Sequence, residues 1–283
     1  MERPKHVFCP RGKVLPLGDR TRIMGVVNVT PDSFSDGGLF RSPERAVAHC
    51  FKLLEDGADI LDIGGESSRP GAKPISSSEE LDRVAPVLEQ VRRDTSAILS
   101  IDTYKPEVAA ECLRLGADVI NDITALRDSS RVGSLVASFK AGIVLMHMRG
   151  DPQTMQTLPP SPDIVAEVTA DLTSAVCRAR EAGIDDGCIV VDPGIGFGKT
   201  VEDNLKLLNR LPEWTHLPVL VGPSRKRFLG EVTGRPVAER TLGTVAAAVI
   251  AAMRGAHIIR VHDVAEVREA LSVVDAVLAE RLS

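Results

Sequence analysis

A chain of 283 residues, 43% hydrophobic and 26% charged, has the composition of an ordinary globular protein with a substantial core. Its net charge of -5 comes from intermixed acids and bases, which excludes a broad basic surface for nucleic acid or anionic membrane. The N-terminus lacks the apolar core of a signal peptide and no apolar run is long enough to span a membrane, so we expect a cytoplasmic protein whose five cysteines are reduced.

Helical and strand patterns alternate along the chain. Helices are predicted at residues 43–55, 78–93, 106–115, 164–182 and 241–254, and apolar strands at 23–27, 60–63, 97–101, 119–121, 143–146, 189–191, 218–221 and 258–261. Three junctions have Gly-Ala directly before a strand, at Gly57, Gly116 and Gly255. Glycine suits the left-handed residue after a helix, and all-apolar runs suit parallel strands buried on both faces.

This alternation predicts the fold and its boundaries. Strand and helix repetition favours parallel α/β topology, and eight units predict a closed (β/α)8 TIM barrel. We expect the barrel at residues 22–283, in a single domain with a short N-terminal extension at residues 1–21. A doubly wound open sheet is the alternative fold, and two small domains are the alternative organisation.

Polar residues follow most of the apolar runs. They are Asn28, Asp62, Asp102, Asn121, His147, Asp192, Ser224-Arg225-Lys226 just after Gly222, and Arg260 with His262. A barrel carries its chemistry at the carboxyl ends of its strands. Strand ends with a purely structural role would show a mixture of serines and lysines, whereas acids, amides and bases converge here. The sequence therefore predicts a ligand-binding rim.

Several of these segments, taken together, resemble the dihydropteroate synthase family. They are residues 24–38, 62–71 and 192–199, followed by Ser224-Arg225-Lys226 and Arg260-Val261-His262, in the family's order and spacing. The resemblance implies a transferase of folate biosynthesis that condenses 6-hydroxymethyl-7,8-dihydropterin pyrophosphate with p-aminobenzoate to give 7,8-dihydropteroate and pyrophosphate. The wider pterin-binding superfamily leaves two alternatives, a methyltetrahydrofolate–corrinoid methyltransferase and a non-catalytic pterin-binding paralogue.

A pterin presents N–H donors beside a carbonyl acceptor, so its pocket needs carboxylates that accept and an ammonium or amide that donates. The predicted pterin groups are Asp102, Asn121, Asp192 and Lys226, to which the resemblance adds Met146 against the ring and Gly222. Simpler roles exist for two of them. Asp102 would serve as a helix N-cap, as would Thr103, and Asp192 would serve as a turn former.

The pyrophosphate leaving group requires positive charge where the C–O bond breaks. Arg260 and His262 lie two residues apart near the last strand, so they point to one side and are predicted to bind it; the alternative for His262 is a solvent-exposed side chain. Such a group usually brings Mg2+, and Asn28 resembles the family residue that helps to hold the metal. With one amide ligand, the metal would be held mainly by phosphate oxygens and water.

By resemblance, loop and rim residues frame p-aminobenzoate. They are Phe34, Ser68, Arg69, Pro70, Phe197 and Ser224. The substrate carboxylate has backbone N–H groups and Ser224 as alternatives to Arg69, and Phe34 has the alternative role of pinning its loop to the barrel. Many relatives have threonine where Ser68 stands, which bears on the binding of sulfonamides that imitate this substrate.

In this family the reaction looks dissociative, so that pyrophosphate leaves before the aromatic amine attacks. Asp36 would then stabilise the pterin cation. The predicted catalytic residues are Asp36, Lys226, Arg260 and His262.

Three further features have no catalytic role in this interpretation. Gly198-Lys199-Thr200 resembles the end of a nucleotide-binding loop, but Pro193 stands where that motif needs glycine. His147 lies between two methionines, a pattern more typical of packing than of metal binding, and is left without a function. The small-residue helix at 245–252 is predicted to pack on the sheet, with one side available for a homodimer.

Overall fold

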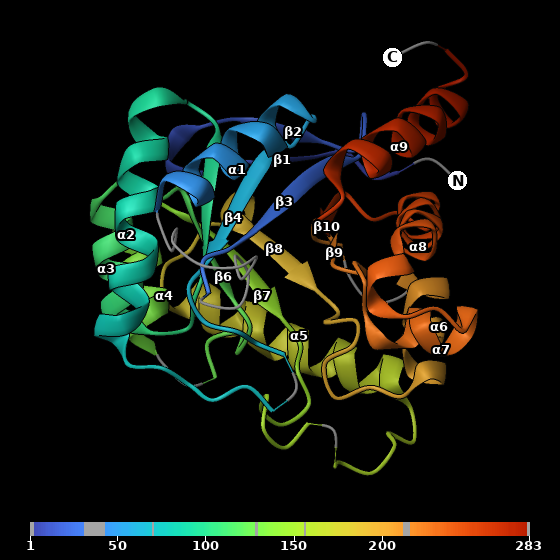
Figure 1. The fold of residues 1–283 in the computed structure, drawn as a ribbon. Coiled ribbons are helices and arrows are strands. Elements are labelled where there is room, and N and C mark those ends of the chain that lie inside the picture. The colour runs from blue at the N-terminus through green and yellow to red at the C-terminus, as the bar shows by residue number, and fades with distance from the viewer. Residues whose placement is uncertain are drawn as a thin grey trace.

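The computed structural model describes residues 3–30, 43–69, 71–127, 130–155, 157–211 and 216–281. Eight parallel strands form one sheet in the order β8-β7-β6-β5-β4-β3-β10-β9 (Figure 1). They are β3 (Arg22–Asn28), β4 (Ile60–Gly64), β5 (Ile98–Asp102), β6 (Val119–Asp122), β7 (Gly142–Met146), β8 (Ile189–Asp192), β9 (Leu220–Val221) and β10 (Ile258–Val261). A bridge between Val191 and Val219 joins the two ends of this order. The predicted (β/α)8 barrel is confirmed.

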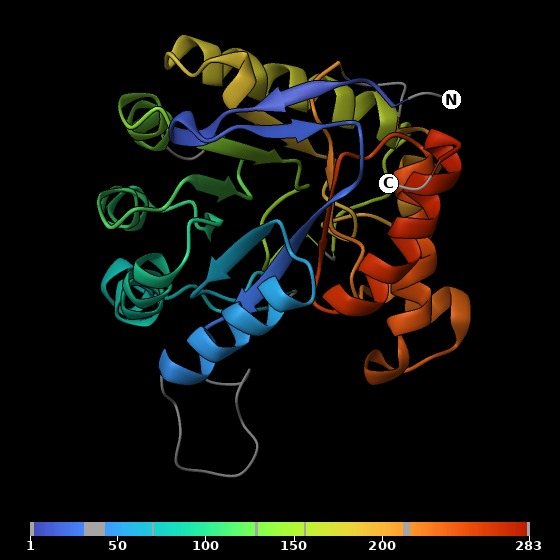
Figure 2. The same cartoon turned by 90° about the horizontal axis from the view of Figure 1, so that it is seen from above.

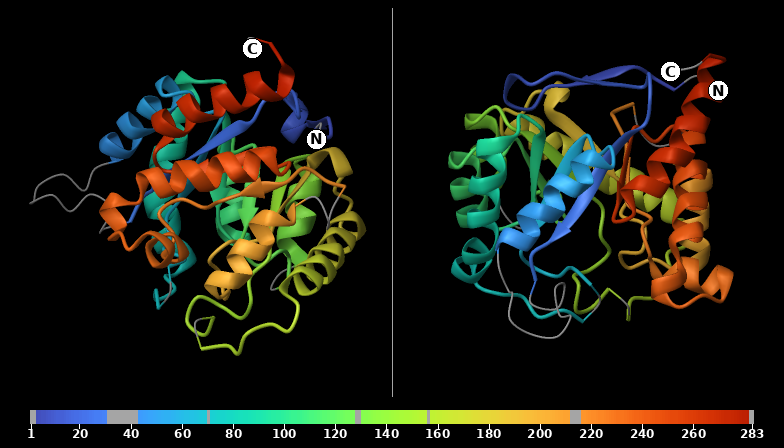
Figure 3. Two further views of the ribbon diagram at one scale, coloured as in Figure 1. Left: turned by 90° about the vertical axis from the view of Figure 1, so that its right-hand side faces the viewer. Right: turned by 45° about the horizontal axis from the view of Figure 1, so that its top comes forward.

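Helices cover the outside of the barrel (Figures 1 and 3). They are α1 (Pro43–Glu55), α2 (Ser77–Asp94), α3 (Pro106–Arg114), α4 (Ser130–Ser138), α5 (Ile164–Glu181), α6 (Val201–Asn209), α7 (Arg227–Thr233), α8 (Thr241–Met253) and α9 (Val264–Ala279). Each helix predicted from the periodic pattern is present with ends within one residue. Among the residues that the structure describes, no helix is both long enough and apolar enough to cross a membrane.

Side-chain caps explain where several helices begin. Ser76 and Asp163 accept backbone N–H bonds in the first turns of α2 and α5. Thr200 and Asp203 form a reciprocal capping box at the start of α6. Such caps satisfy N–H groups that a helix start otherwise leaves unpaired. The cap at Thr200 also fixes the end of the loop that follows β8, which belongs to the site described below.

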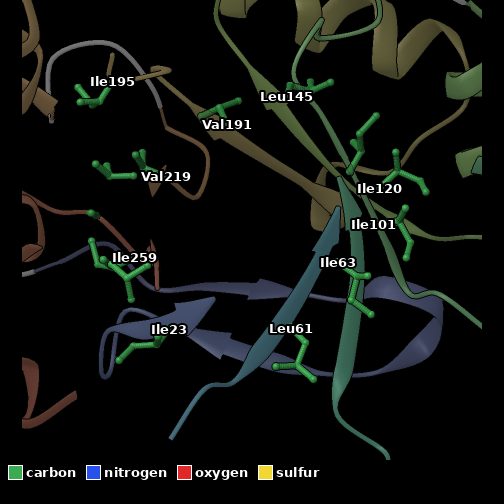
Figure 4. Close-up of a cluster of buried hydrophobic side chains, with 14 of the residues drawn as sticks. Ile23, Leu61, Ile63, Ile101, Ile120, Leu145, Val191, Ile195, Val219 and Ile259 are labelled. Carbon is green, nitrogen blue, oxygen red and sulfur yellow. The ribbon is translucent and has the colours of Figure 1, made fainter. Parts of the chain in front are cut away.

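Outward-facing strand side chains form the main core together with the helices. Figure 4 shows the strand part of this core, which includes Ile23, Leu61, Ile63, Ile101, Ile120, Leu145, Val191, Val219 and Ile259. These side chains contact apolar residues of the surrounding helices, such as Val84 and Val108. Because alternate residues of a strand point to opposite faces, the residues between them point into the barrel.

The inward-facing residues at the starts of the strands form a second core. They are Met24, Ile60, Ile98, Val119, Val144, Val190, Leu220 and Ile258, and they pack with Phe8, Leu15 and Leu17. The last three residues belong to the strands β1 (His6–Phe8) and β2 (Leu15–Leu17), which pair antiparallel. The pair, coloured blue in Figure 2, lies across this end of the barrel. The sequence pattern predicts no element within residues 1–21, because three-residue strands show too little periodicity.

Gly142 and Phe8 test this packing. A Cβ atom at Gly142 would lie 2.4 Å from Phe8 Cζ, so the β1–β2 pair would have to shift. We expect Gly142→Ala to lower the free energy of unfolding by about 1–3 kcal/mol, the usual cost of overpacking a tight core. Urea denaturation measures the change. Gly187→Ala is the matched control, because its Cβ would meet no atom closer than 3.8 Å, and it should stay within about 0.5 kcal/mol of the parent. Equal effects of both substitutions would contradict this role of the pair.

Candidate functional site

The inner face of the barrel turns polar above the apolar layer. Two residues further along the strands stand Val26, Asp62, Ser100, Asn121, Met146, Asp192, Gly222 and Arg260. A cavity of about 1320 Å³ lies at the carboxyl ends of the strands, lined by strand-end residues and by the loops that follow β4, β8 and β9. Val26 and Arg260 of this layer line the cavity itself, and we call the layer as a whole the floor of the site.

Asp62 is the centre of the floor and is fully buried. Ser100 donates from Oγ to Asp62 Oδ1 (2.6 Å), and Asn121 donates from Nδ2 to Asp62 Oδ2 (3.0 Å). Arg260 donates from Nε to the same Oδ2 (2.6 Å). Although Asp62 stands among the polar residues of the rim, no role for it follows from the sequence. A signal was present, because a lone carboxylate interrupts an otherwise apolar strand.

Arg260 joins two acids across the barrel. Besides Asp62, its Nη2 donates to Asp102 Oδ2 at 2.8 Å. Burial raises the pKa of Asp102, and the Arg260 guanidinium opposes that rise. The N-cap interpretation of Asp102 is wrong, because Lys105 occupies the cap position of α3 and makes no side-chain cap bond. Both Asp102 and Arg260 line the cavity instead.

Asp192 has a double role. Its Oδ1 accepts from the backbone N–H of Gly194 (2.7 Å), so the proposed turn former is confirmed. The carboxylate is also buried among cations. Burial raises the pKa of Asp192, and the charges of Lys226 and Arg260 counteract this effect. An acid between two cations at the base of a cavity is suited to accept hydrogen bonds from a cationic or N–H-rich ligand.

Lys226 lies over the ring of Phe197, with Nζ 4.1 Å from the ring centroid. Its ammonium also donates to the backbone carbonyl of Ile195. Burial lowers the pKa of Lys226 to about 7, despite the opposing charge of Asp192. Lys226 and Phe197 both line the cavity, so a ligand beside them would meet an aromatic ring and a donor together.

His262 is held in one orientation by its neighbours. Asn28 Nδ2 lies 3.3 Å from His262 Nε2, and Ser224 Oγ lies 2.9 Å from His262 Nδ1. With Asn28 as donor, the ring proton is on Nδ1 and is donated to Ser224. Burial, with the charges of Arg260 and Arg225, lowers the pKa of His262 to about 4. His262 is partly buried and hydrogen-bonded, so the interpretation as a merely solvent-exposed histidine is wrong.

The loop after β4 carries Ser68 and Arg69, which both line the cavity. The base of this loop is fixed by an ion cluster that no sequence motif predicts. Lys105 Nζ lies 2.6 Å from Glu66 Oε2 and 2.6 Å from Glu80 Oε2. Since Lys105 belongs to the connection after β5, the cluster ties two neighbouring strand ends together and limits where the tip of the loop can go.

Most predicted site residues meet in this cavity. Its lining includes Asn28, Ser68, Arg69, Asp102, Phe197, Ser224, Lys226, Arg260 and His262. The predicted pterin residues outside the lining are Asn121, Met146, Asp192 and Gly222, although Asn121 reaches the floor through Asp62. Phe34, Asp36 and Pro70 lie outside the described residues. Among the residues that the structure does describe, no group of three or more His, Cys, Asp and Glu side chains could hold a metal ion.

Comparison with known proteins agrees with this geometry. The family model described as "Pterin binding enzyme" matches residues 24–262. The chain is 48% identical over 263 residues to the dihydropteroate synthase of Escherichia coli K12, with 92% of each protein covered.

Two solved structures are also similar. The dihydropteroate synthase of Xanthomonas albilineans with 4-aminobenzoic acid has a TM-score of 0.91 and 48% identity, covering 98% of this chain and 99% of the other. That of Yersinia pestis with a sulfonamide drug complex has a TM-score of 0.91 and 43% identity, covering 96% and 99%. The chain belongs to the pterin-binding enzyme family and, within it, to the dihydropteroate synthases.

Proposed function

We propose that the cavity joins 6-hydroxymethyl-7,8-dihydropterin pyrophosphate to p-aminobenzoate, with release of pyrophosphate and formation of 7,8-dihydropteroate. The protein is a transferase of folate biosynthesis. The arrangement of the floor carries the proposal. Its acids and amide can accept hydrogen bonds from the N–H groups of a pterin, and its cations lie beside the place proposed for the leaving group. The Xanthomonas relative with 4-aminobenzoic acid and the Yersinia relative with a sulfonamide support this substrate and mark the site as a sulfonamide target.

The pterin edge is assigned to the floor. Asp102 and Asp192 accept its N–H groups, and Lys226 donates to its carbonyl oxygen. Asn121 is oriented by Asp62, so that its amide oxygen is left for the ligand. Met146 and Gly222 complete the predicted pocket, and support for Met146 comes from its burial in one apolar cluster with Phe197.

The pyrophosphate is assigned to Arg260 and His262, with Asn28 beside them. Asn28 supplies one neutral amide oxygen, so a metal at this place would be held mainly by phosphate oxygens of the substrate and by water. We propose that Mg2+ binds in this way, where it would neutralise the charge that develops on the leaving oxygen. Arg260 contributes a fixed guanidinium to the same oxygens.

The p-aminobenzoate ring is assigned to the space beside Phe197 and the Lys226 stem. Ser224 and the loop residues Ser68 and Arg69 stand where the substrate carboxylate needs donors, and all of them line the cavity. The predicted roles of Phe34 and Pro70 in this pocket, and of Asp36 beside the cation, stay predictions.

The chemical step follows from this placement. As the C–O bond breaks, Arg260 holds the departing pyrophosphate while Asp102 and Asp192 stabilise the positive charge left on the pterin. The aromatic amine then attacks the exposed methylene carbon, forms the new C–N bond and gives one proton to the released pyrophosphate. No covalent bond to the protein is required.

We also propose a homodimer and a cytoplasmic setting. α8 and α9 lie side by side (Figure 3, left), and both expose apolar side chains, among them Ile250 and Met253 on α8 and Val273 and Val277 on α9. The opposite side of α8 buries Ala247 and Ala251 against the barrel, as the small-residue pattern predicts. The free state of all five cysteines supports a reducing compartment.

A turnover assay tests the function directly. The purified protein with both substrates and Mg2+ should release pyrophosphate in equal amount to dihydropteroate, and omission of either substrate should abolish release. Calorimetry gives the binding control. Pterin binding without turnover would favour the non-catalytic paralogue, and methyl transfer from methyltetrahydrofolate to a corrinoid protein would favour the methyltransferase. Relatives named dihydropteroate synthase at 48% identity favour the first outcome.

The pKa of Lys226 predicts how pterin binding depends on pH. Since burial lowers that pKa to about 7, the ammonium that donates to the pterin is present below about pH 7 and is lost above it. We expect the affinity for 6-hydroxymethyl-7,8-dihydropterin to fall as pH rises from about 8 to about 9, by up to about tenfold per unit, a range in which Asp102, whose pKa burial raises to about 7, is already ionised. Calorimetry measures it. Lys226→Met should bind weakly with no such dependence, and a wild-type affinity that increases over this range would contradict the assignment.

Two substitutions separate the two halves of the substrate. Arg260→Lys keeps a cation near Asp62 but loses the planar fork, so we expect pyrophosphate to bind about tenfold more weakly, while the pterin without pyrophosphate, which competes with Arg260 for Asp102, binds no more weakly than to the parent. Lys226→Met should do the reverse. Isothermal calorimetry with each ligand gives both comparisons. If both variants weakened both ligands equally, the division of the cavity into these two parts would be wrong.

A further inference from the structure

The loop between β8 and α6 contains a lysine, Lys199, that lines the cavity but whose ammonium binds the protein itself. Lys199 Nζ donates to the backbone carbonyls of Gly194 (2.9 Å) and Phe197 (3.0 Å) and to His147 Nδ1 (2.9 Å). An ammonium has three protons, and all of them meet protein acceptors here. A lysine that binds nucleotide phosphates would direct these protons outward. The likeness of Gly198-Lys199-Thr200 to a nucleotide loop is therefore superficial.

His147 is the fixed partner of this lysine. It is 3% exposed, and its backbone N–H donates to the carbonyl of Asp192 (2.9 Å). Burial and the nearby charge of Lys199 lower the pKa of His147 to about 2, so its ring is neutral. Because Nδ1 accepts from Lys199, the ring proton is on Nε2, which lies 3.2 Å from an oxygen of Asp171 on α5. The ring is thus held by β7 on one side and faces α5 on the other.

The loop that Lys199 holds presents two groups to Lys226. One is the Ile195 carbonyl, which accepts from the Lys226 ammonium, and the other is the Phe197 ring, 4.1 Å from that ammonium. Loop and strand are in close contact, because a Cβ atom at Gly194 would lie 1.8 Å from the His147 carbonyl oxygen. A shift of this loop would therefore move both partners of Lys226 together.

We propose that Lys199, held by His147, is a positioning residue of the p-aminobenzoate pocket, which sets the place of the Phe197 ring relative to Lys226. This inference rests on the proposed function. Lys199 acts through the loop and does not touch the reacting atoms. Burial also lowers the pKa of Lys199 to about 7, in keeping with an ammonium enclosed by the loop.

The test compares Lys199→Met with a matched lysine at the other end of the barrel. Lys13 also has three acceptors, the carbonyls of Ser96 and Ala97 and the carboxylate of Asp118, but it lies beside the β1–β2 pair. We expect Lys199→Met to raise KM for p-aminobenzoate about tenfold or more, because the Phe197 ring loses its fixed position beside this substrate. Its Kd for 6-hydroxymethyl-7,8-dihydropterin should rise by a smaller factor, because the acids Asp102 and Asp192 assigned to the pterin lie on the strands β5 and β8 and not in this loop. Lys13→Met should change neither constant.

His147→Phe provides an independent variant, because it keeps most of the ring volume but removes the acceptor of Lys199. KM for p-aminobenzoate should rise again, by a smaller factor than in Lys199→Met, and pterin Kd should change less than KM. The inference is overturned if Lys199→Met and His147→Phe leave KM at the parent value, or if KM, kcat and pterin Kd all change together as in general loosening of the fold. A wild-type protein that binds pterin without turnover would instead contradict the proposed function.

Discussion

The site depends on one buried carboxylate. Asp62 is fully enclosed by the barrel, where an unpaired charge would cost several kcal/mol. Three donors from neighbouring positions of the barrel satisfy it, those of Ser100, Asn121 and Arg260. This requirement fixes the orientation of Asn121 and draws the Arg260 guanidinium into the centre of the floor. Asp62 thus orients the groups that are assigned to pterin and pyrophosphate, although Asp62 itself is assigned to no ligand.

Barrel geometry turns this local requirement into a complete site. Parallel strands bring their inner positions to one axis, so the apolar residues Ile60 and Ile98 are followed two residues later by the polar groups of Asp62 and Ser100. The apolar layer makes the barrel rigid, and the polar layer supplies the charged and hydrogen-bonding side chains of the site. Loops then add what the strands cannot supply, namely the Phe197 ring and the donors of Ser68 and Arg69. A lysine holds each of these two loops. The buried Lys105 binds Glu66 in the loop after β4, and the half-buried Lys199 of the loop after β8 binds His147 at the end of β7.

Much of the fold could be predicted because its signals are local. Gly-Ala before an apolar run, as at Gly57, marks a helix end and a strand start within a few residues. The β1–β2 pair could not be predicted, since its three-residue strands owe their place to contacts such as Phe8 with Gly142. The convergence of Asp102, Lys226 and His262 in one cavity was predictable from their positions after strands.

The direction of a side chain was harder to predict than its place. Arg260 lies within β10 and turns toward Asp62 and Asp102. A pterin that reaches Asp102 therefore meets an acid with an internal competitor already in place. The pterin has to displace this guanidinium from Asp102, so a neutral pterin gains less binding free energy than its hydrogen bonds alone would give. A ligand that carries an anion beside the pterin offers Arg260 a new partner at the same moment, and this exchange favours the pyrophosphate-bearing substrate over its simpler analogue.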